Sequence, residues 1–261
     1  HDAQGRVMEL NKAAAEIGRE VADKSGRTVI VAGSVGPTGD IMMPMGSLTH
    51  ELAVEMFHEQ AEGLKAGGAD VLWVETISAF EEYAAAAEAF KLADMPWCGT
   101  MSFDTAGRTM MGVTSREMVK SVAKLAYQPQ GFGANCGTGA SDLLRTILGM
   151  ADADPDLPLI SKGNAGIPKY VEGHIHYDGT PELMADYAEL ARNCGARIIG
   201  GCCGTTPEHL TAMREALETR PKGDRPTLDQ ITAALGSFSS ESDGTDGNGP
   251  VRAARRGKRR G

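Results

Sequence analysis

The sequence predicts an α/β protein built on a parallel sheet. Between residues 9 and 219, six short apolar segments alternate with helical segments, at the spacing of roughly 30 residues that a strand–helix–strand unit needs. The strand segments are continuous apolar runs, which is the pattern expected when both faces of a strand are covered. The 33 glycines and an aromatic content of 5% suit many tight strand-to-helix turns better than a β-sandwich with an aromatic core.

Each predicted element rests on its periodicity and on the signals at its ends. Residues 9–24 carry apolar side chains at helical spacing and end before Gly26, and residues 28–35 form a buried strand run. The other predicted strands cover residues 70–76, 97–103, 131–136, 158–161 and 196–201. The other predicted helices cover residues 49–65, 80–92, 115–127, 140–150, 181–194 and 207–219. This alternation fits both an open doubly wound sheet and a closed barrel, and in either one ligands bind at the carboxyl ends of the strands.

Charge is distributed unevenly along the chain. The net charge is −9, and six of the 26 basic residues lie between Val251 and Gly261, where there is no acidic residue. The first 250 residues therefore carry 20 basic against 35 acidic residues, and such an acidic body is a poor partner for nucleic acid. The basic end follows a Ser/Gly/Asp-rich stretch, so we expect a solvated, disordered tail there rather than a nucleic-acid contact.

The sequence also bears on the membrane and on the compartment. No window approaches the roughly 20 consecutive apolar residues that a membrane span requires, and the first residues contain no apolar signal-peptide core. The five cysteines are odd in number and two of them are adjacent, which makes a poor disulfide framework. We therefore expect no membrane segment and a reducing cytoplasmic location.

Three cysteines directly follow predicted strands. Cys136 lies in the segment Gly133-Ala-Asn-Cys-Gly-Thr138, and Cys202 and Cys203 lie in Gly200-Gly-Cys-Cys-Gly-Thr205. In a parallel sheet these thiols emerge at the same edge, and the glycines around the vicinal pair permit a turn that lets both thiols face one ion. Three thiolates with an open fourth position are typical of a catalytic zinc site.

Two other interpretations of these cysteines stay open on spacing alone. In the first, the thiols are buried and unreactive, which is the ordinary state of free cysteines. In the second, a histidine completes a structural site with four ligands, although the paired C-x-x-C spacing of such sites is absent. The candidate histidines are His174, His176 and His209.

Four segments resemble the homocysteine S-methyltransferase family, which includes betaine–homocysteine methyltransferases, S-methylmethionine-dependent enzymes and the homocysteine domain of cobalamin-dependent methionine synthase. Two of them are the cysteine segments given above, and their combination makes the match specific. The other two are Gly33-Ser-Val-Gly-Pro-Thr-Gly39 and Ala69-Asp-Val-Leu-Trp-Val-Glu-Thr76. The resemblance runs in order from about Asp2 to Leu217.

The resemblance implies a (β/α)8 TIM barrel. The family's first two strands have no counterpart among the six predicted here, and the first residue is His1, so we expect the chain to lack its true beginning. We expect the N-terminally incomplete barrel domain over residues 1–220. A helical extension is expected over residues 221–236 and the disordered tail over residues 237–261.

The resemblance also implies the roles of individual residues. It implies a zinc ion held by Cys136, Cys202 and Cys203, with the homocysteine sulfur in the fourth position. Glu75, which ends a predicted strand, is expected to bind the homocysteine ammonium, and an ion pair with a neighbouring Lys or Arg is the alternative for this carboxylate. Asn135 either donates a hydrogen bond to the substrate or fixes the turn before the first cysteine.

The expected activity is zinc-dependent transfer of a methyl group to the homocysteine thiolate, giving methionine. A free thiol is mostly protonated at neutral pH, and zinc removes that proton, so no separate general base is required. Betaine is the expected donor, S-methylmethionine is the second choice, and methyltetrahydrofolate through cobalamin is the third because no room remains for folate and cobalamin domains. A hypothesis of a different class is a thiol- or zinc-sensing protein, which binds zinc without converting homocysteine.

Overall fold

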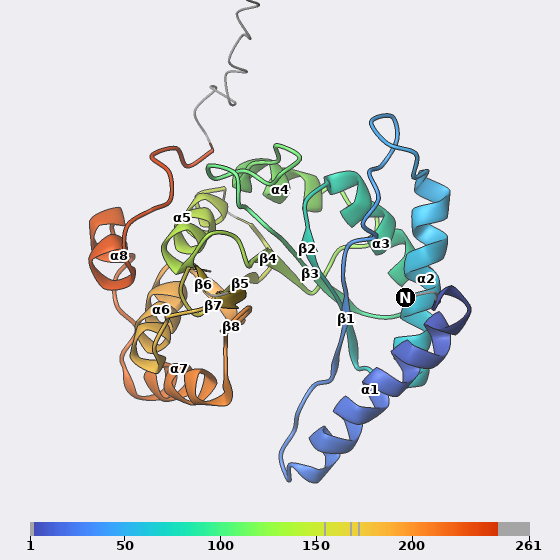
Figure 1. Cartoon of the computed structure of the whole chain (residues 1–261), viewed down its shortest axis with the longest axis horizontal. Coiled ribbons are helices and arrows are strands. Elements are labelled where there is room, and N and C mark those ends of the chain that lie inside the picture. The colour runs from blue at the N-terminus through green and yellow to red at the C-terminus, as the bar shows by residue number, and fades with distance from the viewer. Residues whose placement is uncertain (1–2, 154, 168, 172, 245–261) are drawn as a thin grey trace, which may run out of the picture.

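The computed structural model describes residues 3–153, 155–167, 169–171 and 173–244. At its centre lies a parallel sheet in which each strand pairs with the next one along the chain, in the order β1–β2–β3–β4–β5–β8. These strands are β1 Ala32–Val35, β2 Val71–Ile77, β3 Trp97–Met101, β4 Gly131–Asn135, β5 Leu159–Gly163 and β8 Ala196–Gly201. The helices lie around the outer side of the sheet (Figure 1) and are α1 Val7–Lys24, α2 His50–Ala66, α3 Phe80–Leu92, α4 Ser115–Val122, α5 Ala140–Ala151, α6 Pro181–Asn193, α7 Pro207–Thr219 and α8 Leu228–Leu235.

The six predicted strands are confirmed, and the largest difference is at the first of them. The strand predicted at residues 28–35 begins only at Ala32. The Asp70 carboxylate accepts a hydrogen bond from the Val31 amide at 2.7 Å, so a side chain takes the donor that a longer ladder would use. Among the helices, α4 ends five residues before the predicted end, because the residues after Val122 form tighter i→i+3 hydrogen bonds.

Burial along β1 and β2 alternates, which differs from the prediction that both faces of every strand are covered. Val35, Leu72 and Val74 are fully buried in the core, whereas Trp73 and Glu75 are partly exposed on the opposite face. Strands β3 and β4 follow the prediction, since all of their residues are buried. The inner face of the sheet is therefore accessible beside β1 and β2.

The sheet curves around this inner face. The Lys162 ammonium on β5 contacts the Glu75 carboxylate on β2 at 2.5 Å, although β3 and β4 lie between these two strands. In a flat sheet, strands three positions apart are separated by about 14 Å. Direct contact between their side chains therefore requires the curvature of a barrel wall. Within the described residues, β1 and β8 form the two ends of the sheet.

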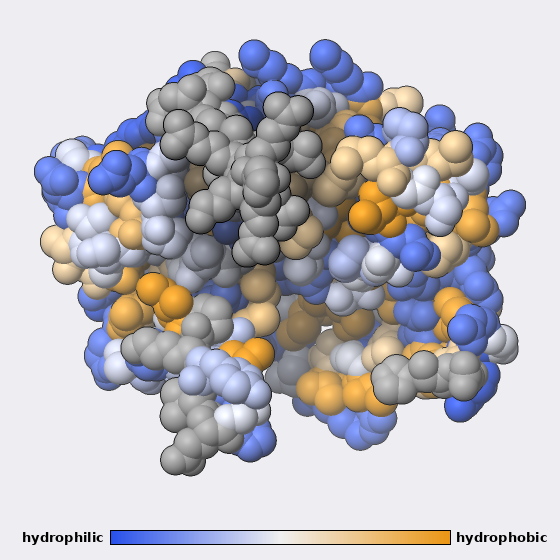
Figure 2. Space-filling view, turned by 45° about the horizontal axis from the view of Figure 1, so that its top comes forward, coloured by the Kyte–Doolittle hydropathy of each residue, from blue (hydrophilic) through white to orange (hydrophobic). Residues whose placement is uncertain are grey.

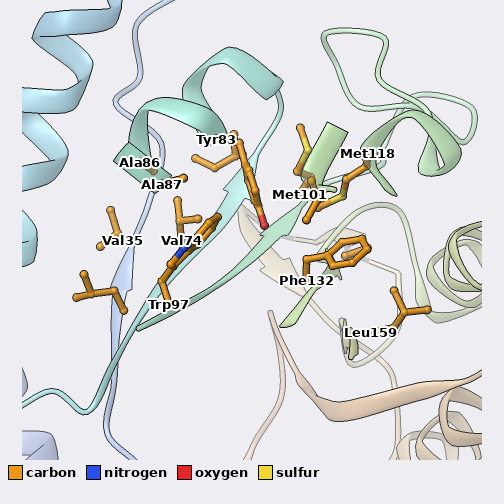
Figure 3. Close-up of a cluster of buried hydrophobic side chains, with 14 of the residues drawn as sticks. Val35, Val74, Tyr83, Ala86, Ala87, Trp97, Met101, Met118, Phe132 and Leu159 are labelled. Atoms are coloured by element: carbon orange, nitrogen blue, oxygen red, sulfur yellow. The ribbon is translucent and has the colours of Figure 1, made fainter. Parts of the chain in front are cut away.

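The main core lies between the outer face of the sheet and the helices. Figure 3 shows Tyr83 of α3 beside Trp97 of β3, and the centroids of these two rings are 5.3 Å apart. Met101, Met118 and Phe132, also fully buried or nearly so, continue the cluster toward α4 and β4. This packing fixes β2, β3 and β4, whose carboxyl ends carry predicted site residues.

The segment between β5 and α6, predicted as a long loop, contains a short antiparallel hairpin. Its strands are β6 Lys169–Val171 and β7 His174–His176. Strands of three residues are too short to produce a periodic pattern of apolar side chains in the sequence, so this hairpin could not be predicted. The loop returns to the sheet through Ala165, whose carbonyl accepts the Gly179 amide at 2.9 Å.

The end of the described chain packs back onto the domain. After α8, which lies within the predicted extension, residues 236–244 form a C-terminal strap along α5. Arg145 donates to the Ser240 carbonyl at 2.8 Å and lies over the Phe238 ring, 4.3 Å from its centroid. The predicted tail thus begins inside the strap, and its remainder, residues 245–261, lies outside the described residues. The division at residues 220 and 236 stays a prediction.

The surface and the helices bear on the membrane question. Figure 2 shows apolar residues in several separate patches among hydrophilic ones on the face that it presents. Among the helices of the described residues, none combines the length and the apolar character that crossing a bilayer requires.

Candidate metal centre

The thiols of Cys136, Cys202 and Cys203 meet at the carboxyl ends of β4 and β8. The Cys136 sulfur lies 3.9 Å from that of Cys203, the Cys202 sulfur lies 4.0 Å from that of Cys203, and all three atoms lie within 4.8 Å of one another. The predicted cluster is therefore formed, although 66 residues separate its first member from the vicinal pair. Cys203 is exposed and the other two are partly exposed, which argues against buried, inert thiols.

Left-handed backbone conformations turn these thiols toward one another. Cys136 has a φ of 60° and Gly137 a φ of 73°, so the chain reverses direction as soon as β4 ends. A non-glycine residue rarely adopts this conformation, and it persists where the surrounding structure enforces it. Here the Cys136 amide donates to the Lys162 carbonyl at 3.1 Å, which holds the residue against β5.

The vicinal pair sits on a turn of its own. Gly204 has a φ of 75°, and a Cβ on it would lie 2.4 Å from the Tyr177 ring, so glycine is required there both for conformation and for space. Burial raises the pKa of the Tyr177 phenol to about 12, with a hydrogen bond to Cys203 as the next cause. Tyr177 was not predicted as a site residue, because it lies in a segment without periodicity.

The three thiols are electrostatically coupled. The hydrogen bond between Cys136 and Cys202 lowers the pKa of Cys202 to about 5 and raises the pKa of Cys136 well above its usual range. The lowered pKa of Cys202 favours its thiolate, which is the form of cysteine that binds metal ions.

Asn135 lies beneath the thiols and is completely buried. Its side-chain oxygen accepts from the Thr76 amide at 2.9 Å and from the Thr100 hydroxyl at 2.7 Å. Its side-chain nitrogen donates to the Thr76 hydroxyl at 2.9 Å and to the Cys202 sulfur at 3.7 Å. These contacts support the second of its two predicted roles, in which Asn135 fixes the local structure.

Asn164 is, with Tyr177, a site residue that sequence reasoning missed. It is 1% exposed, donates to the Cys136 sulfur at 3.7 Å and to the Gly137 carbonyl at 3.2 Å, and accepts from the Cys203 amide at 3.1 Å. Asn164 directly follows the last residue of β5, and Asn135 is the last residue of β4, directly before Cys136. The position of Asn164 after a strand was the available signal, and an asparagine in a loop carries no pattern that points to a thiol.

Glu75 faces the interior of the curved sheet near the cluster. Its carboxylate accepts from the Ser34 hydroxyl at 2.6 Å and forms the ion pair with Lys162 at 2.5 Å. The Lys162 ammonium also lies over the Trp73 ring, 5.1 Å from its centroid. The ion pair predicted as the alternative role of Glu75 is thus present, and both charged side chains remain 21% exposed to an incoming ligand.

The histidines considered as a fourth structural ligand lie elsewhere. The Nδ1 atom of His209 accepts from the Thr206 amide at 3.0 Å, and its Nε2 atom lies 2.8 Å from the Gly179 carbonyl, so both ring nitrogens are occupied. His174 and His176 lie exposed on the hairpin. The group of potential metal ligands found in the described part of the chain contains the three cysteines only.

The sulfur spacing fits a zinc ion. Zinc binds thiolates at about 2.3 Å in a tetrahedron, which places bound sulfurs about 3.8 Å apart. The observed separations of 3.9 and 4.0 Å are close to this value. An ion held by three sulfurs on this partly exposed edge would have its fourth tetrahedral position open toward solvent.

A cavity of about 580 Å³ opens beside Cys136. Its apolar lining consists largely of methionines and one aromatic ring, from Met42, Met43, Met45, Met110, Met111 and Phe80. Its charged lining residues are all acidic, namely Asp40, Glu81, Glu82 and Asp104. Cys136 and Gly137 form part of the wall, so a molecule in this cavity reaches the thiol cluster.

Parallel strands that curve into a barrel wall and present a three-thiol cluster at their carboxyl ends define a TIM-barrel-like α/β enzyme with a candidate thiolate metal centre. The chain belongs to the homocysteine S-methyltransferase family, whose model matches residues 1–217. It is therefore a methyltransferase, and homocysteine is the methyl acceptor that this family defines.

Solved structures agree with this assignment. The homocysteine methyltransferase MmuM from Escherichia coli, in its apo form, is 25% identical over 81% of this chain and 75% of that chain, with a TM-score of 0.66. The metallated form of the same enzyme matches 79% of this chain and 70% of that chain at 24% identity, with a TM-score of 0.65. The predicted barrel-type fold and family are confirmed.

Proposed function

We propose that this chain transfers a methyl group from a cationic donor to the homocysteine thiolate, with a zinc ion held by Cys136, Cys202 and Cys203. The observation that carries the proposal is the spacing of the three sulfurs, 3.9 and 4.0 Å, on a chain of this family. Among the residues that the structure describes, no histidine joins the cluster, which favours sulfur alkylation over water activation because an all-thiolate site leaves a bound sulfur nucleophilic.

The zinc ion would keep the acceptor thiol deprotonated at neutral pH. The protein itself positions the ligand sulfurs and the acceptor. The left-handed turn at Cys136 and the glycine turn after Cys203 hold the three ligand sulfurs on one side, which leaves the opposite side to the acceptor. The acceptor sulfur then attacks the donor methyl carbon, the bond from that carbon to the positively charged donor atom breaks, and a neutral leaving group departs.

Glu75 is proposed to bind the ammonium group of homocysteine. Ser34 and Lys162 fix its carboxylate, so the acceptor's ammonium meets an oriented anion rather than a mobile one. Lys162 is available at the same place to pair with the acceptor's carboxylate. A Glu–Lys pair that remains partly exposed thus matches both charges of an α-amino acid.

The cavity beside Cys136 is proposed to hold the donor. Its four acidic residues favour a cation, and its described lining contains no lysine, arginine or histidine. The Glu82 carboxylate accepts hydrogen bonds from the Thr38 amide and hydroxyl, both at 2.7 Å. Asp40, Glu81 and Asp104 supply the remaining negative charge near the cavity.

The charge of this cavity distinguishes the two donors expected from the resemblance. Betaine carries a carboxylate and no net charge, and it would bring that carboxylate into an acidic cavity that offers a single aromatic ring for its methylammonium group. S-methylmethionine also carries a carboxylate, but its sulfonium and ammonium groups give it a net positive charge, and carboxylates of the cavity can bind the ammonium. The cavity therefore favours S-methylmethionine over betaine, the donor preferred on sequence resemblance.

The test is methionine formation by the purified chain with zinc and homocysteine, with each donor supplied in turn. We expect turnover with S-methylmethionine to exceed turnover with betaine, and Asp104→Asn to raise KM for the cationic donor more than the surface change Asp229→Asn does. Zinc binding without methionine from any donor would favour the zinc-sensing hypothesis. Turnover with betaine alone would overturn the assignment of the donor but not the acceptor chemistry.

The proposed catalytic domain covers residues 1–220, with α8 in a separate extension. The family match ends at residue 217 and α7 ends at Thr219, which supports this boundary. The extension packs against α5 and α6 and leads into the strap. Deleting residues from 221 onward tests the division, since an independent domain keeps its zinc and its far-UV spectrum.

A further inference from the structure

A short segment at the carboxyl end of β5 lies between the two parts of the chain that carry the thiols. The Cys136 amide donates to the Lys162 carbonyl at 3.1 Å, and the Cys202 amide donates to the Gly163 carbonyl at 2.7 Å. The Ala165 amide then donates to the Cys203 carbonyl at 2.9 Å. Residues 162–165 thus pair with both cysteine segments through their backbone.

The side chain of Asn164 adds further hydrogen bonds between this segment and both cysteine segments. Its oxygen accepts from the Cys203 amide at 3.1 Å, while its nitrogen donates to the Gly137 carbonyl at 3.2 Å and to the Cys136 sulfur at 3.7 Å. The backbone partners define the orientation of the carboxamide, since an amide donates and a carbonyl accepts. The N–H that points to Cys136 is therefore a donor, held in a side chain that is 1% exposed.

Asn135 makes the corresponding contact with a second sulfur. Its oxygen takes two donors, from Thr76 and Thr100, so its nitrogen is directed to the Thr76 hydroxyl and to the Cys202 sulfur at 3.7 Å. Two buried carboxamides thus each direct one N–H to one ligand sulfur. Cys203, the exposed member of the cluster, has no carboxamide donor in the described residues.

We propose that Asn164 is a positioning residue for the methyl transfer, which sets the spacing of Cys136 and Cys203 and, with Asn135 at Cys202, makes the ligand sulfurs poorer nucleophiles than the acceptor sulfur. This inference rests on the proposed zinc-dependent function. An N–H directed at a thiolate stabilises its charge and withdraws electron density from the sulfur. A methyl donor in the adjacent cavity contacts the wall formed by Cys136, so this ligand in particular needs protection from methylation.

The first measurement uses the unaltered chain without metal. Methyl iodide is added for a limited time, and peptide mass spectrometry gives the methylated fraction of each cysteine. In this reaction a sulfur lone pair forms the new bond to carbon, the carbon–iodine bond breaks, and iodide leaves. We expect Cys203 to be methylated several-fold faster than Cys136 and Cys202. Equal rates at the three thiols, or fastest reaction at Cys136 or at Cys202, would overturn the protective role.

The second measurement compares Asn164→Asp with the unaltered chain. The aspartate keeps the size of the side chain and the acceptor for the Cys203 amide, but it replaces the donor to the Cys136 sulfur and to the Gly137 carbonyl by an oxygen. We expect zinc affinity, measured by competition with a chromogenic chelator, to fall roughly 10–100-fold. We also expect the sulfur-to-metal band of the Co²⁺-substituted chain to shift and methylation of Cys136 to increase.

The matched control is Asn193→Asp, at an asparagine that accepts from the Gly223 amide at 3.0 Å outside the cluster. A merely structural role for Asn164 predicts that both variants lower the melting temperature while the Co²⁺ spectrum and zinc affinity stay unchanged, and that result would overturn the proposal. If the unaltered chain binds neither zinc nor Co²⁺, the proposed function fails. If it binds them and Asn164→Asp binds equally well, this inference alone fails.

Discussion

The ammonium of Lys162 lies 2.5 Å from the carboxylate of Glu75 and joins β5 to β2 across the inner face of the curved sheet. Each side chain is 21% exposed, so the pair is neither fully buried nor freely solvated. Glu75 also accepts from Ser34 on β1. Three strands of the barrel wall thus meet at one carboxylate close to the thiol cluster.

The first prediction separates the ion-pair role of Glu75 from its proposed binding role. We expect Glu75→Gln to weaken homocysteine binding at least tenfold and to leave zinc content unchanged, because a carboxylate that pairs with the ammonium is lost. Unfolding free energy should fall by about 1–3 kcal/mol, since Lys162 loses a charge-assisted partner. Isothermal titration with homocysteine and zinc analysis measure the two effects.

Lys162→Met is the control for this prediction. It removes the same ion pair and the proposed partner of the acceptor's carboxylate but keeps the Glu75 carboxylate, so we expect a similar loss of stability and a loss of homocysteine affinity that comes from the acceptor's carboxylate rather than from its ammonium. If the two variants bind homocysteine as tightly as the unaltered chain, Glu75 serves only the ion pair.

The second prediction concerns the metal ligands. We expect Cys136→Ser, Cys202→Ser and Cys203→Ser each to reduce bound zinc from one ion per chain to none after dialysis, and to abolish methionine formation. Two remaining thiolates do not hold the ion against dilution. Cys98→Ser, in the core and away from the cluster, is the matched control and should keep the zinc. A Cys203→Ser variant with full zinc occupancy would contradict the three-ligand assignment.

The third prediction concerns His209, which caps α7 rather than binding metal. His209→Ala should leave zinc content unchanged, because both ring nitrogens contact protein atoms at Thr206 and Gly179. It should lower the unfolding free energy by about 0.5–2 kcal/mol, the usual cost of losing an N-terminal cap. Thermal unfolding and metal analysis of the same sample check both parts, and loss of zinc would restore the four-ligand structural site.

The fourth prediction concerns the two cysteines outside the cluster. Burial raises the pKa of Cys98 to about 11 and the pKa of Cys194 to about 12. A raised pKa means that the thiolate forms only above those values, so at pH 8 both residues remain thiols. We expect a disulfide reagent at pH 8 to label up to three thiols per metal-free chain and fewer when zinc is bound. Labelling of Cys98 or Cys194 in the folded chain would contradict this.

The fifth prediction concerns the C-terminal strap. Arg145 is buried, pairs with Asp142 at 2.8 Å and donates to the Ser240 carbonyl. We expect Arg145→Leu to release residues 236–244, with faster hydrogen exchange there, and to cost about 1–3 kcal/mol because Asp142 keeps a buried charge without its partner. Arg214→Leu, at an exposed helix ion pair, is the control and should change neither quantity measurably. Unchanged exchange in the Arg145 variant would mean that other contacts hold the strap.

Much of this site was predictable because it lies at strand ends. Apolar runs place β4 and β8 within a residue of their observed ends, and a parallel sheet then brings Cys136 and the vicinal pair to one edge. The spacing of the sulfurs depends on two left-handed residues at 136 and 137, and only the glycine carried a sign of this conformation. The contact between Glu75 and Lys162 depends on sheet curvature, which no local pattern encodes.

Asn164 and His209 show a second reason for the limits of sequence reasoning. The roles of both residues lie in hydrogen bonds to atoms about 25 to 40 positions away, at Cys136, Cys203 and Gly179. Propensity and periodicity report on neighbours within a turn or a strand. A polar residue in a loop therefore gives no indication of a distant partner until the fold is known.

The strictly sequential order of the strands bears on how the chain acquires its metal during synthesis. Cys136 precedes Cys202 by 66 residues, so at 5–20 residues per second it leaves the ribosome roughly 3–13 s earlier. During that interval Cys136 is the one member of the cluster outside the ribosome, and a lone thiol offers a zinc ion a single ligand. The ligand set is complete only when β8 pairs with β5. In the proposed function, zinc loading would therefore wait until β8 has formed, and a chain that ends before residue 202 would lack two of the three ligands.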